Sequence, residues 1–158
     1  MTYIRTKSIN KNMYAYVVES TTTPKGPRQN VKQYLGRVYT TTKNEMQKKK
    51  GITAKNTTDF LRQLASRELY AHGFTIKRNN VEFSNVLFSQ KSFTLQNGKK
   101  NVVVKLNEGY LCHHTLQKIQ KFTKTDDVAK DGFVLARLII EAGMTISEEE
   151  FIHFYKLH

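Results

Sequence analysis

The first 40 residues follow the period-two pattern that is typical of β-strands. In segment 13–20, the side chains at even positions, two of them tyrosines, share one face, whereas Ala15 and Val17 share the other. Residues 2–39 are rich in Tyr, Val, Ile and Thr, which are common on the half-buried surface of a sheet. We therefore expect a small antiparallel β-module here. The expected strands are 3–9, 13–20 and 31–39.

Turn-forming residues separate these strands. Residues 10–12, Asn-Lys-Asn, predict a short hairpin turn. Residues 21–30 contain Pro24, Gly26 and Pro27, and proline both fixes the backbone and removes a hydrogen-bond donor. The second connection is therefore expected to project as a partly stiffened basic loop.

A helix is predicted over 59–72, where apolar residues recur at helical spacing and Asp59 lies in the first turn. Gly73 supplies the left-handed exit that ends many helices. Strand-forming sequence then returns, and Asn97-Gly98 predicts a type I′ hairpin turn. The strands expected in this part are 74–76, 81–88, 93–95 and 102–106.

The last third is predicted to be helical. One helix is expected to start at Asn107 or Glu108, a second at Asp126 or Asp127, and a third at a capping box over 147–150. The fold class is therefore predicted to be α+β. The expected division is a basic β-module over 1–40, a basic linker over 41–57, and an α+β domain with C-terminal helices over 58–158.

Length and composition exclude several classes of protein. With 158 residues, 39% of them hydrophobic, the chain suits one compact domain or two very small ones and is too apolar for wholesale disorder. The longest mostly apolar run, 133–142, is interrupted by charges and is too short to cross a bilayer. A lone cysteine, Cys112, forbids an internal disulfide framework. We expect an intracellular, cytoplasmic protein with no membrane partner.

Basic residues are segregated along the chain. The sequence has 26 Lys and Arg against 13 Asp and Glu, a net charge of +13. Residues 1–105 hold 20 basic and 5 acidic residues, whereas residues 106–158 hold 6 basic and 8 acidic residues. An ordinary surface mixes both signs, and a segregated basic surface is typical of nucleic-acid binding.

Four short sequences in the β-module carry a resemblance. YIR at 3–5, YAYVVES at 14–20, GPRQ at 26–29 and VKQYLGRV at 31–38 resemble the N-terminal segment of DDE-type insertion-sequence transposases. The same pattern is similar to the opening of small uncharacterised archaeal proteins. The resemblance implies a β-rich module suited to DNA. It implies no catalytic chemistry, because that chemistry needs three carboxylates spread over a much longer ribonuclease-H-like domain.

Candidate catalytic and metal-binding groups are few. Cys112, His113 and His114 include zinc-binding residue types, but structural zinc sites combine two separate groups of ligands, and adjacent helical residues point about 100° apart. Tyr155, considered as a strand-transfer nucleophile, has only scattered basic neighbours. The sequence also lacks a Gly-rich phosphate-binding motif. We predict a non-catalytic protein with no metal and no cofactor.

The predicted function is nucleic-acid binding, with double-stranded DNA favoured over RNA and a nucleoid association if DNA is the ligand. Contacts to phosphates are expected to dominate, and about eight of them would give a slope near −7 for log affinity against log salt. The predicted contacts are Arg5, Lys7, Lys11, Lys25, Arg28, Lys32 and Arg37, with Lys48, Lys49, Lys50, Lys99 and Lys100 as secondary contacts.

Two alternatives stay open. An RNA- or ribosome-binding protein would stack unpaired bases on exposed aromatic side chains. The candidates for stacking are Tyr14, Tyr16, Tyr34 and Tyr39. A protein-interaction adaptor would instead use the slightly acidic C-terminal helices to recruit a partner or to self-associate.

Overall fold

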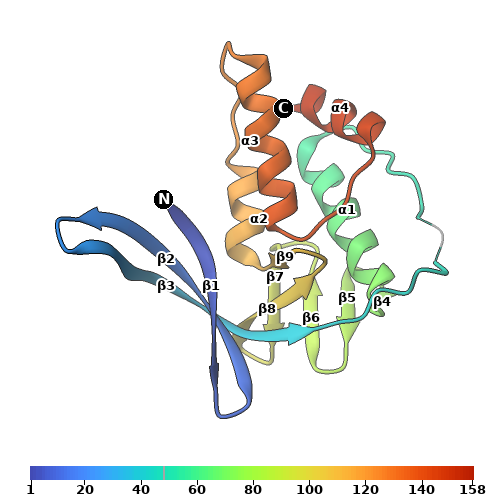
Figure 1. Cartoon of the computed structure of the whole chain (residues 1–158). Coiled ribbons are helices and arrows are strands. Elements are labelled where there is room, and N and C mark those ends of the chain that lie inside the picture. The colour runs from blue at the N-terminus through green and yellow to red at the C-terminus, as the bar shows by residue number, and fades with distance from the viewer. Residues whose placement is uncertain (48) are drawn as a thin grey trace.

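The computed structural model describes residues 1–47 and 49–158, and these form one mixed sheet with four helices (Figure 1). The predicted α+β class is confirmed. The strands are β1 (Thr2–Ile9), β2 (Asn12–Thr23), β3 (Gly26–Thr40), β4 (Thr75–Lys77), β5 (Asn80–Phe83), β6 (Val86–Ser89), β7 (Thr94–Asn97), β8 (Lys100–Leu106) and β9 (Gly109–Leu111). The helices are α1 (Thr57–Ala71), α2 (His113–Gln120), α3 (Val128–Glu141) and α4 (Glu148–Leu157).

The strand order in the sheet is β1-β2-β3-β8-β7-β6-β5-β4. Strand β9 lies outside this order and pairs with β8. All neighbours are antiparallel except β3 and β8, which pair in parallel from Arg37 opposite Val102 to Thr40 opposite Lys105. The expected β-module is therefore hydrogen-bonded to the rest of the chain along one strand. Figure 1 shows β1 to β3 projecting from the body as an arm, with the helices gathered above the rest of the sheet.

Two apolar clusters hold the fold together. The larger one joins α1 to β5–β8 and the C-terminal helices, and within it Phe60 stacks on Phe154 with ring centroids 4.4 Å apart. The smaller one lies under one face of the arm and includes Ala15, Val17 and Val103. The other face of β2 is only partly covered, because Tyr14 and Tyr16 are half-buried there whereas Val18 is buried.

The arm differs from the prediction at its second connection. Residues 21–30 do not form a projecting loop, because β2 continues to Thr23 and β3 begins at Gly26. The turn is only Pro24-Lys25, and Pro27 pairs with Thr22 inside the ribbon. Pro27 is tolerated there because β8 pairs with β3 only from Arg37 onward, which leaves this part of β3 at an edge of the sheet. The first turn is confirmed, since Asn10 and Lys11 join β1 to β2.

Helix α1 forms almost where the sequence predicts it. The Asn56 side chain accepts a hydrogen bond from the Asp59 backbone N–H at 2.8 Å and caps the N-terminus. At the other end, Gly73 has a φ of +92° and the Phe74 N–H donates to the Leu69 carbonyl at 3.1 Å. The predicted start and exit of this helix are confirmed.

Three predictions between residues 74 and 111 are wrong in detail. The expected strand 81–88 is two strands, β5 and β6, because the chain turns at Ser84-Asn85. The turn between β7 and β8 is Gly98-Lys99 with positive φ at Gly98, so it is not the type I′ turn centred on Asn97-Gly98. The helix expected from Asn107 or Glu108 is instead a hairpin to β9, followed by α2.

The last two helices begin at the predicted caps. Asp127 accepts from the Lys130 backbone N–H, and Ser147 and Glu150 form the reciprocal capping box of α4. Gly109 lets β9 meet the end of α3, because a Cβ there would lie 2.3 Å from both the Gly143 nitrogen and the Ile140 oxygen. Among the helices of residues 1–47 and 49–158, none is long and apolar enough to cross a membrane.

The segment before α1, expected as a basic linker, lies against the body. The Asn44 N–H donates to the Ala71 carbonyl at 2.8 Å, and the Gln63 side chain donates to the Thr53 carbonyl at 2.7 Å. The division into a module, a linker and a domain stays a prediction.

Candidate nucleic-acid interface

Two β-bulges decide which side chains of β3 face outward. The register passes from Ala15 opposite Gly36 to Tyr16 opposite Tyr34, so β3 holds one extra residue at this point. Tyr34 and Arg37 are three residues apart and would point to opposite faces of a regular strand. The extra residue brings both to the same face. A second bulge, at Lys32, brings Val31 to the face that Tyr34 occupies.

The result is a surface of cross-strand rows, which we call the tyrosine face. One row places Arg5 of β1 beside Tyr16 of β2 and Tyr34 of β3. The next places Lys7 beside Tyr14 and Arg37. Tyr3 lies two residues before Arg5 on β1 and therefore on the same face. The tyrosine face thus consists of Tyr3, Arg5, Lys7, Tyr14, Tyr16, Tyr34 and Arg37, and it lies opposite the small apolar cluster.

Three tyrosine rings gather at the centre of this face. The Tyr34 ring centroid lies 5.3 Å from that of Tyr16 and 6.4 Å from that of Tyr14. Tyr34 is nevertheless 56% exposed. Partial burial, together with the two neighbouring phenols, raises the pKa of Tyr34. A phenol is protonated at neutral pH even at its ordinary pKa of about 10. The ring is therefore an uncharged stacking surface that does not repel phosphates.

Side-chain hydrogen bonds hold the edge of the face in place. Arg5 donates to the Oε1 atom of Gln29, and Gln29 donates to the hydroxyl of Tyr3. Gln29 belongs to β3, on the far side of β2 from β1. The two contacts therefore tie the guanidinium and the phenol of β1 across the full width of the arm.

A groove runs between the tyrosine face and the tip of the β7–β8 hairpin. It has a volume of about 920 Å³, within the range of small-ligand sites. Tyr39 is fixed in its wall, since Asn97 donates to its hydroxyl at 2.8 Å and the Arg37 guanidinium carbon lies 5.1 Å from its ring centroid. The residues lining the groove are Tyr14, Tyr34, Leu35, Arg37, Tyr39, Asn97, Lys99, Lys100, Asn101 and Val102.

The tyrosine face and the groove together contain nine of the predicted contacts on one continuous surface. These are Arg5, Lys7, Tyr14, Tyr16, Tyr34, Arg37, Tyr39, Lys99 and Lys100.

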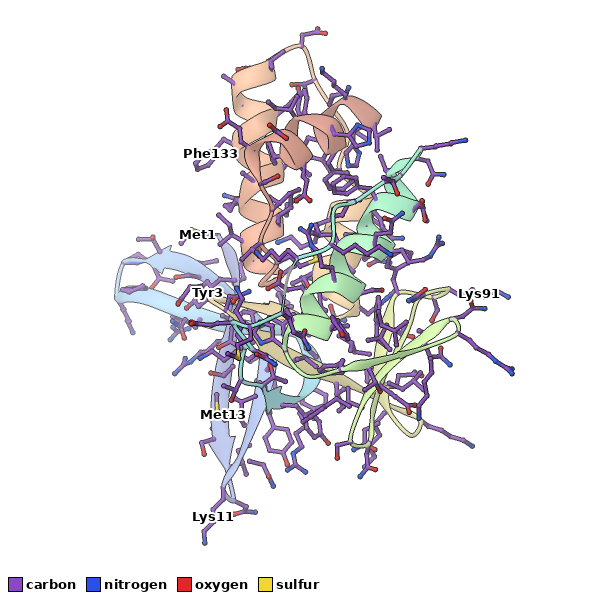
Figure 2. All side chains as sticks on the ribbon, turned by 90° about the vertical axis from the view of Figure 1, so that its right-hand side faces the viewer. Met1, Tyr3, Lys11, Met13, Lys91 and Phe133 are labelled. Carbon is purple, nitrogen blue, oxygen red and sulfur yellow. The ribbon has the colours of Figure 1, made fainter. Side chains whose placement is uncertain are left out.

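Other predicted contacts lie apart from this surface. Lys11 is at the far end of the β1–β2 hairpin, which Figure 2 shows pointing away from the helices. Lys25 is in the β2–β3 turn, and Arg28 pairs with Thr21 on the face opposite to Gln29. The Lys32 amine lies 2.6 Å from Glu19, and this contact lowers the pKa of the Glu19 carboxyl. Lys32 is therefore already neutralised.

The lysines of the linker face another part of the molecule. Lys48 lies outside the described residues. The Lys49 amine donates to the Thr145 hydroxyl at 2.6 Å, and that hydroxyl donates to the buried carboxylate of Glu68 at 2.8 Å. The Lys50 carbonyl oxygen accepts a hydrogen bond from the Arg67 guanidinium at 3.1 Å. These contacts hold the linker to α1 and to the loop before α4, and the structure does not bring Lys49 or Lys50 to the tyrosine face.

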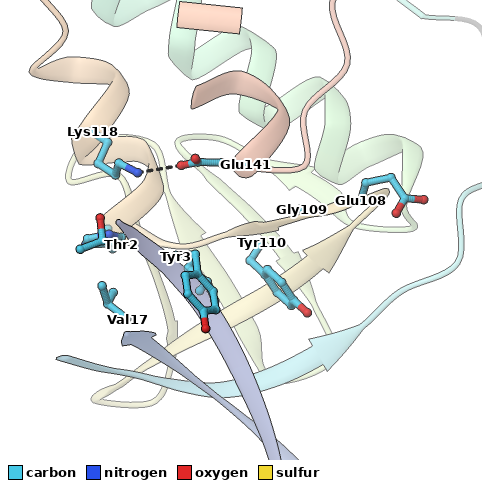
Figure 3. Close-up of a pocket in the computed structure, with 10 residues that line it drawn as sticks. Thr2, Tyr3, Val17, Glu108, Gly109, Tyr110, Lys118 and Glu141 are labelled. Carbon is cyan, nitrogen blue, oxygen red and sulfur yellow. Dashed lines mark hydrogen bonds and ion pairs between the residues drawn. The ribbon is translucent and has the colours of Figure 1, made fainter. Parts of the chain in front are cut away.

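A smaller hollow of about 190 Å³ separates the arm from α2 and α3 (Figure 3). Tyr3 and Tyr110 line it, and the Lys118 amine lies 2.7 Å from the Glu141 carboxylate. Burial lowers the pKa of His114, which keeps its ring neutral at neutral pH. Because its lysine is paired, this hollow is a poor site for an anion.

Cys112 belongs to the small apolar cluster. Cys112 is buried, and burial raises the pKa of its thiol. The Nδ1 atom of His113 lies 3.1 Å from the Phe93 carbonyl. Across the part of the chain that the structure describes, three His, Cys, Asp or Glu side chains nowhere come together in a way that would hold a metal ion.

Sequence reasoning missed three contributors to the surface. Tyr3 has the same period-two spacing as Arg5 and Lys7, so the pattern could have identified it. Asn97 and Asn101 were not identifiable, because only the parallel pairing of β3 with β8 brings the hairpin tip beside the arm.

No protein-family model, curated protein or solved structure matches the chain. The resemblance of the first 40 residues to transposase N-termini stays a prediction.

Proposed function

We propose that the protein binds nucleic acid through the tyrosine face and the adjoining groove. The observation that carries the proposal is the placement of five basic side chains around a tyrosine cluster on one surface, in which Tyr34 is exposed and Tyr14 and Tyr16 are half-buried. The basic residues are Arg5, Lys7, Arg37, Lys99 and Lys100. Cations supply affinity for the phosphate backbone, and aromatic rings supply stacking surfaces for bases.

The charge distribution supports the same proposal. Ion pairs occupy several basic residues elsewhere, including Lys32 with Glu19, Arg67 with Glu150 and Lys118 with Glu141. The ion pairs found among the described residues include none formed by the five basic residues of the interface. Their charge is therefore available to a polyanion.

A salt titration tests the proposal. Five phosphate contacts predict that log affinity falls against log salt with a slope of about −3.5 for a single strand and about −4.5 for a duplex. The eight contacts expected from the sequence would give a slope near −7. Fluorescence anisotropy with labelled oligonucleotides over a range of salt concentrations measures the slope. A slope near zero would contradict nucleic-acid binding by this surface.

Self-association is a second candidate function, because apolar side chains are exposed on α3 and α4. Val128, Phe133, Ile140 and Ile152 are between 46% and 68% exposed. A hollow of about 260 Å³ between the two helices adds apolar lining from Phe151. Phe133 and Ile140 share one side of α3 at helical spacing, whereas Val128 lies on another side and lines the hollow with Ile152. Exposed apolar groups of this kind mark sites of protein–protein contact.

Self-association through α3 and α4 predicts a sedimentation coefficient that rises with the concentration of the full chain. Phe133→Asp is expected to abolish the rise, because it places a charge in the apolar surface. Val31→Asp is the matched control, since Val31 is 66% exposed but lies on β3. A sedimentation coefficient that stays constant for the unmodified chain would rule this candidate out.

A further inference from the structure

The groove and the tyrosine cluster together indicate which form of nucleic acid is bound. Tyr34 lies at the junction of the two, because it contacts the rings of Tyr14 and Tyr16 and also lines the groove. Its ring is the most exposed of these three. A base can cover such a ring only when its own face is free.

A duplex does not offer a free base face. Its bases are stacked inside the helix, and extruding one costs free energy that an unpaired strand does not pay. Duplex-binding surfaces use cations for the phosphates and polar side chains for the base edges, and need no stacking platform. An exposed aromatic ring among cations is instead the combination that holds single strands.

The groove supplies positive charge for the phosphates next to a stacked base. Arg37 forms one wall beside Tyr34, and Lys99 and Lys100 lie on the hairpin tip that forms the other. Phosphates on either side of the base can therefore be neutralised from both walls. The contacts of Tyr39 with Asn97 and Arg37 hold this part of the groove lining in place before any ligand arrives.

We propose that the groove takes an unpaired nucleotide whose base stacks on Tyr34, so that the ligand is single-stranded DNA or RNA and not an intact duplex. This inference rests on the proposed function and narrows it. It replaces the duplex DNA favoured by the sequence with a single strand, because the bulges of β3 gather tyrosines that a duplex would leave unused.

The test compares the affinities of the full chain for three labelled probes of equal length: oligo-dU, oligo-rU, and a mixed-sequence DNA duplex. We expect either single strand to bind more tightly than the duplex. Tyr34→Leu is expected to weaken single-strand binding about 5- to 150-fold, as loss of one stacked base does, and to weaken duplex binding much less. Tyr34→Phe keeps the ring and should bind like the unmodified chain. The tighter of the two single strands identifies the preferred sugar.

Tyr70→Leu is the matched control, because Tyr70 is 44% exposed but lies on α1. Circular dichroism of each variant verifies that the fold is intact, and exposed Tyr34 tolerates the change. Tighter binding of the duplex, or equal effects of Tyr34→Leu and Tyr70→Leu, would overturn this inference and leave nucleic-acid binding in place. Failure of all three probes to bind would overturn the proposed function as well.

Discussion

Replacing Arg5, Lys7 and Arg37 together by glutamate is expected to lower the affinity for nucleic acid by about 100-fold or more. Each lost phosphate contact removes the favourable release of condensed counterions, and each new carboxylate repels the backbone. The three side chains are exposed and spread over β1 and β3 of one face. The slope of log affinity against log salt should become shallower by about 2 to 3. Anisotropy titrations of the triple variant measure both effects.

The control for this variant changes the net charge equally on the helical end. Lys121, Lys130 and Lys156 are exposed residues in or next to α2, α3 and α4. Their triple replacement by glutamate is expected to alter the affinity by less than about fivefold, because at physiological salt distant charges are screened beyond about 8 Å. Equal losses for the two triple variants would mean that the positive charge acts only through the net charge of the chain.

The strands and helix caps were predictable because their signals are local. The alternation along 13–20 places Tyr14 and Tyr16 on one face without any knowledge of partners. Likewise Asn56, Asp127 and Ser147 cap their helices through backbone groups three residues away. Such contacts depend only on sequence spacing, so the sequence contains all the information that they need.

The candidate site was only partly predictable because it depends on distant pairing. The sequence identified the lysines of the hairpin tip and the basic residues of the arm, but gave no measure of the distance between them. The parallel pairing of β3 with β8 brings them together across more than 60 residues of chain. The sequence also predicted that Lys32 and Lys49 would contact the ligand. In the structure these two side chains contact Glu19 and Thr145, and such partners become neighbours only after folding, so the sequence did not reveal them.

The bulge at Leu35-Gly36 is the least obvious determinant of the site, and Gly36 is the residue that permits it. Gly36 has a φ of +127°, which side chains of L-residues rarely adopt. A Cβ at this position would lie 2.2 Å from the Asn101 carbonyl oxygen and 3.1 Å from the Val102 Cα atom. Both are backbone atoms of β8, so they cannot rotate away. Only glycine lets β3 approach the wall of the groove this closely.

Gly36→Ala is therefore expected to lower the free energy of unfolding by about 3 to 5 kcal/mol, from steric overlap added to backbone strain. Gly26→Ala is the matched control in the same strand, because Gly26 has a φ of +104° but an added Cβ would meet no atom within 4 Å. It should cost only about 1 to 2 kcal/mol. Urea unfolding monitored by circular dichroism measures both values. Any Gly36→Ala protein that stays folded should also bind nucleic acid more weakly, since pushing β3 from β8 separates Arg37 from Lys99 and Lys100. Similar losses of stability for the two variants would show that strain alone, and not close packing of β3 on β8, accounts for glycine at this bulge.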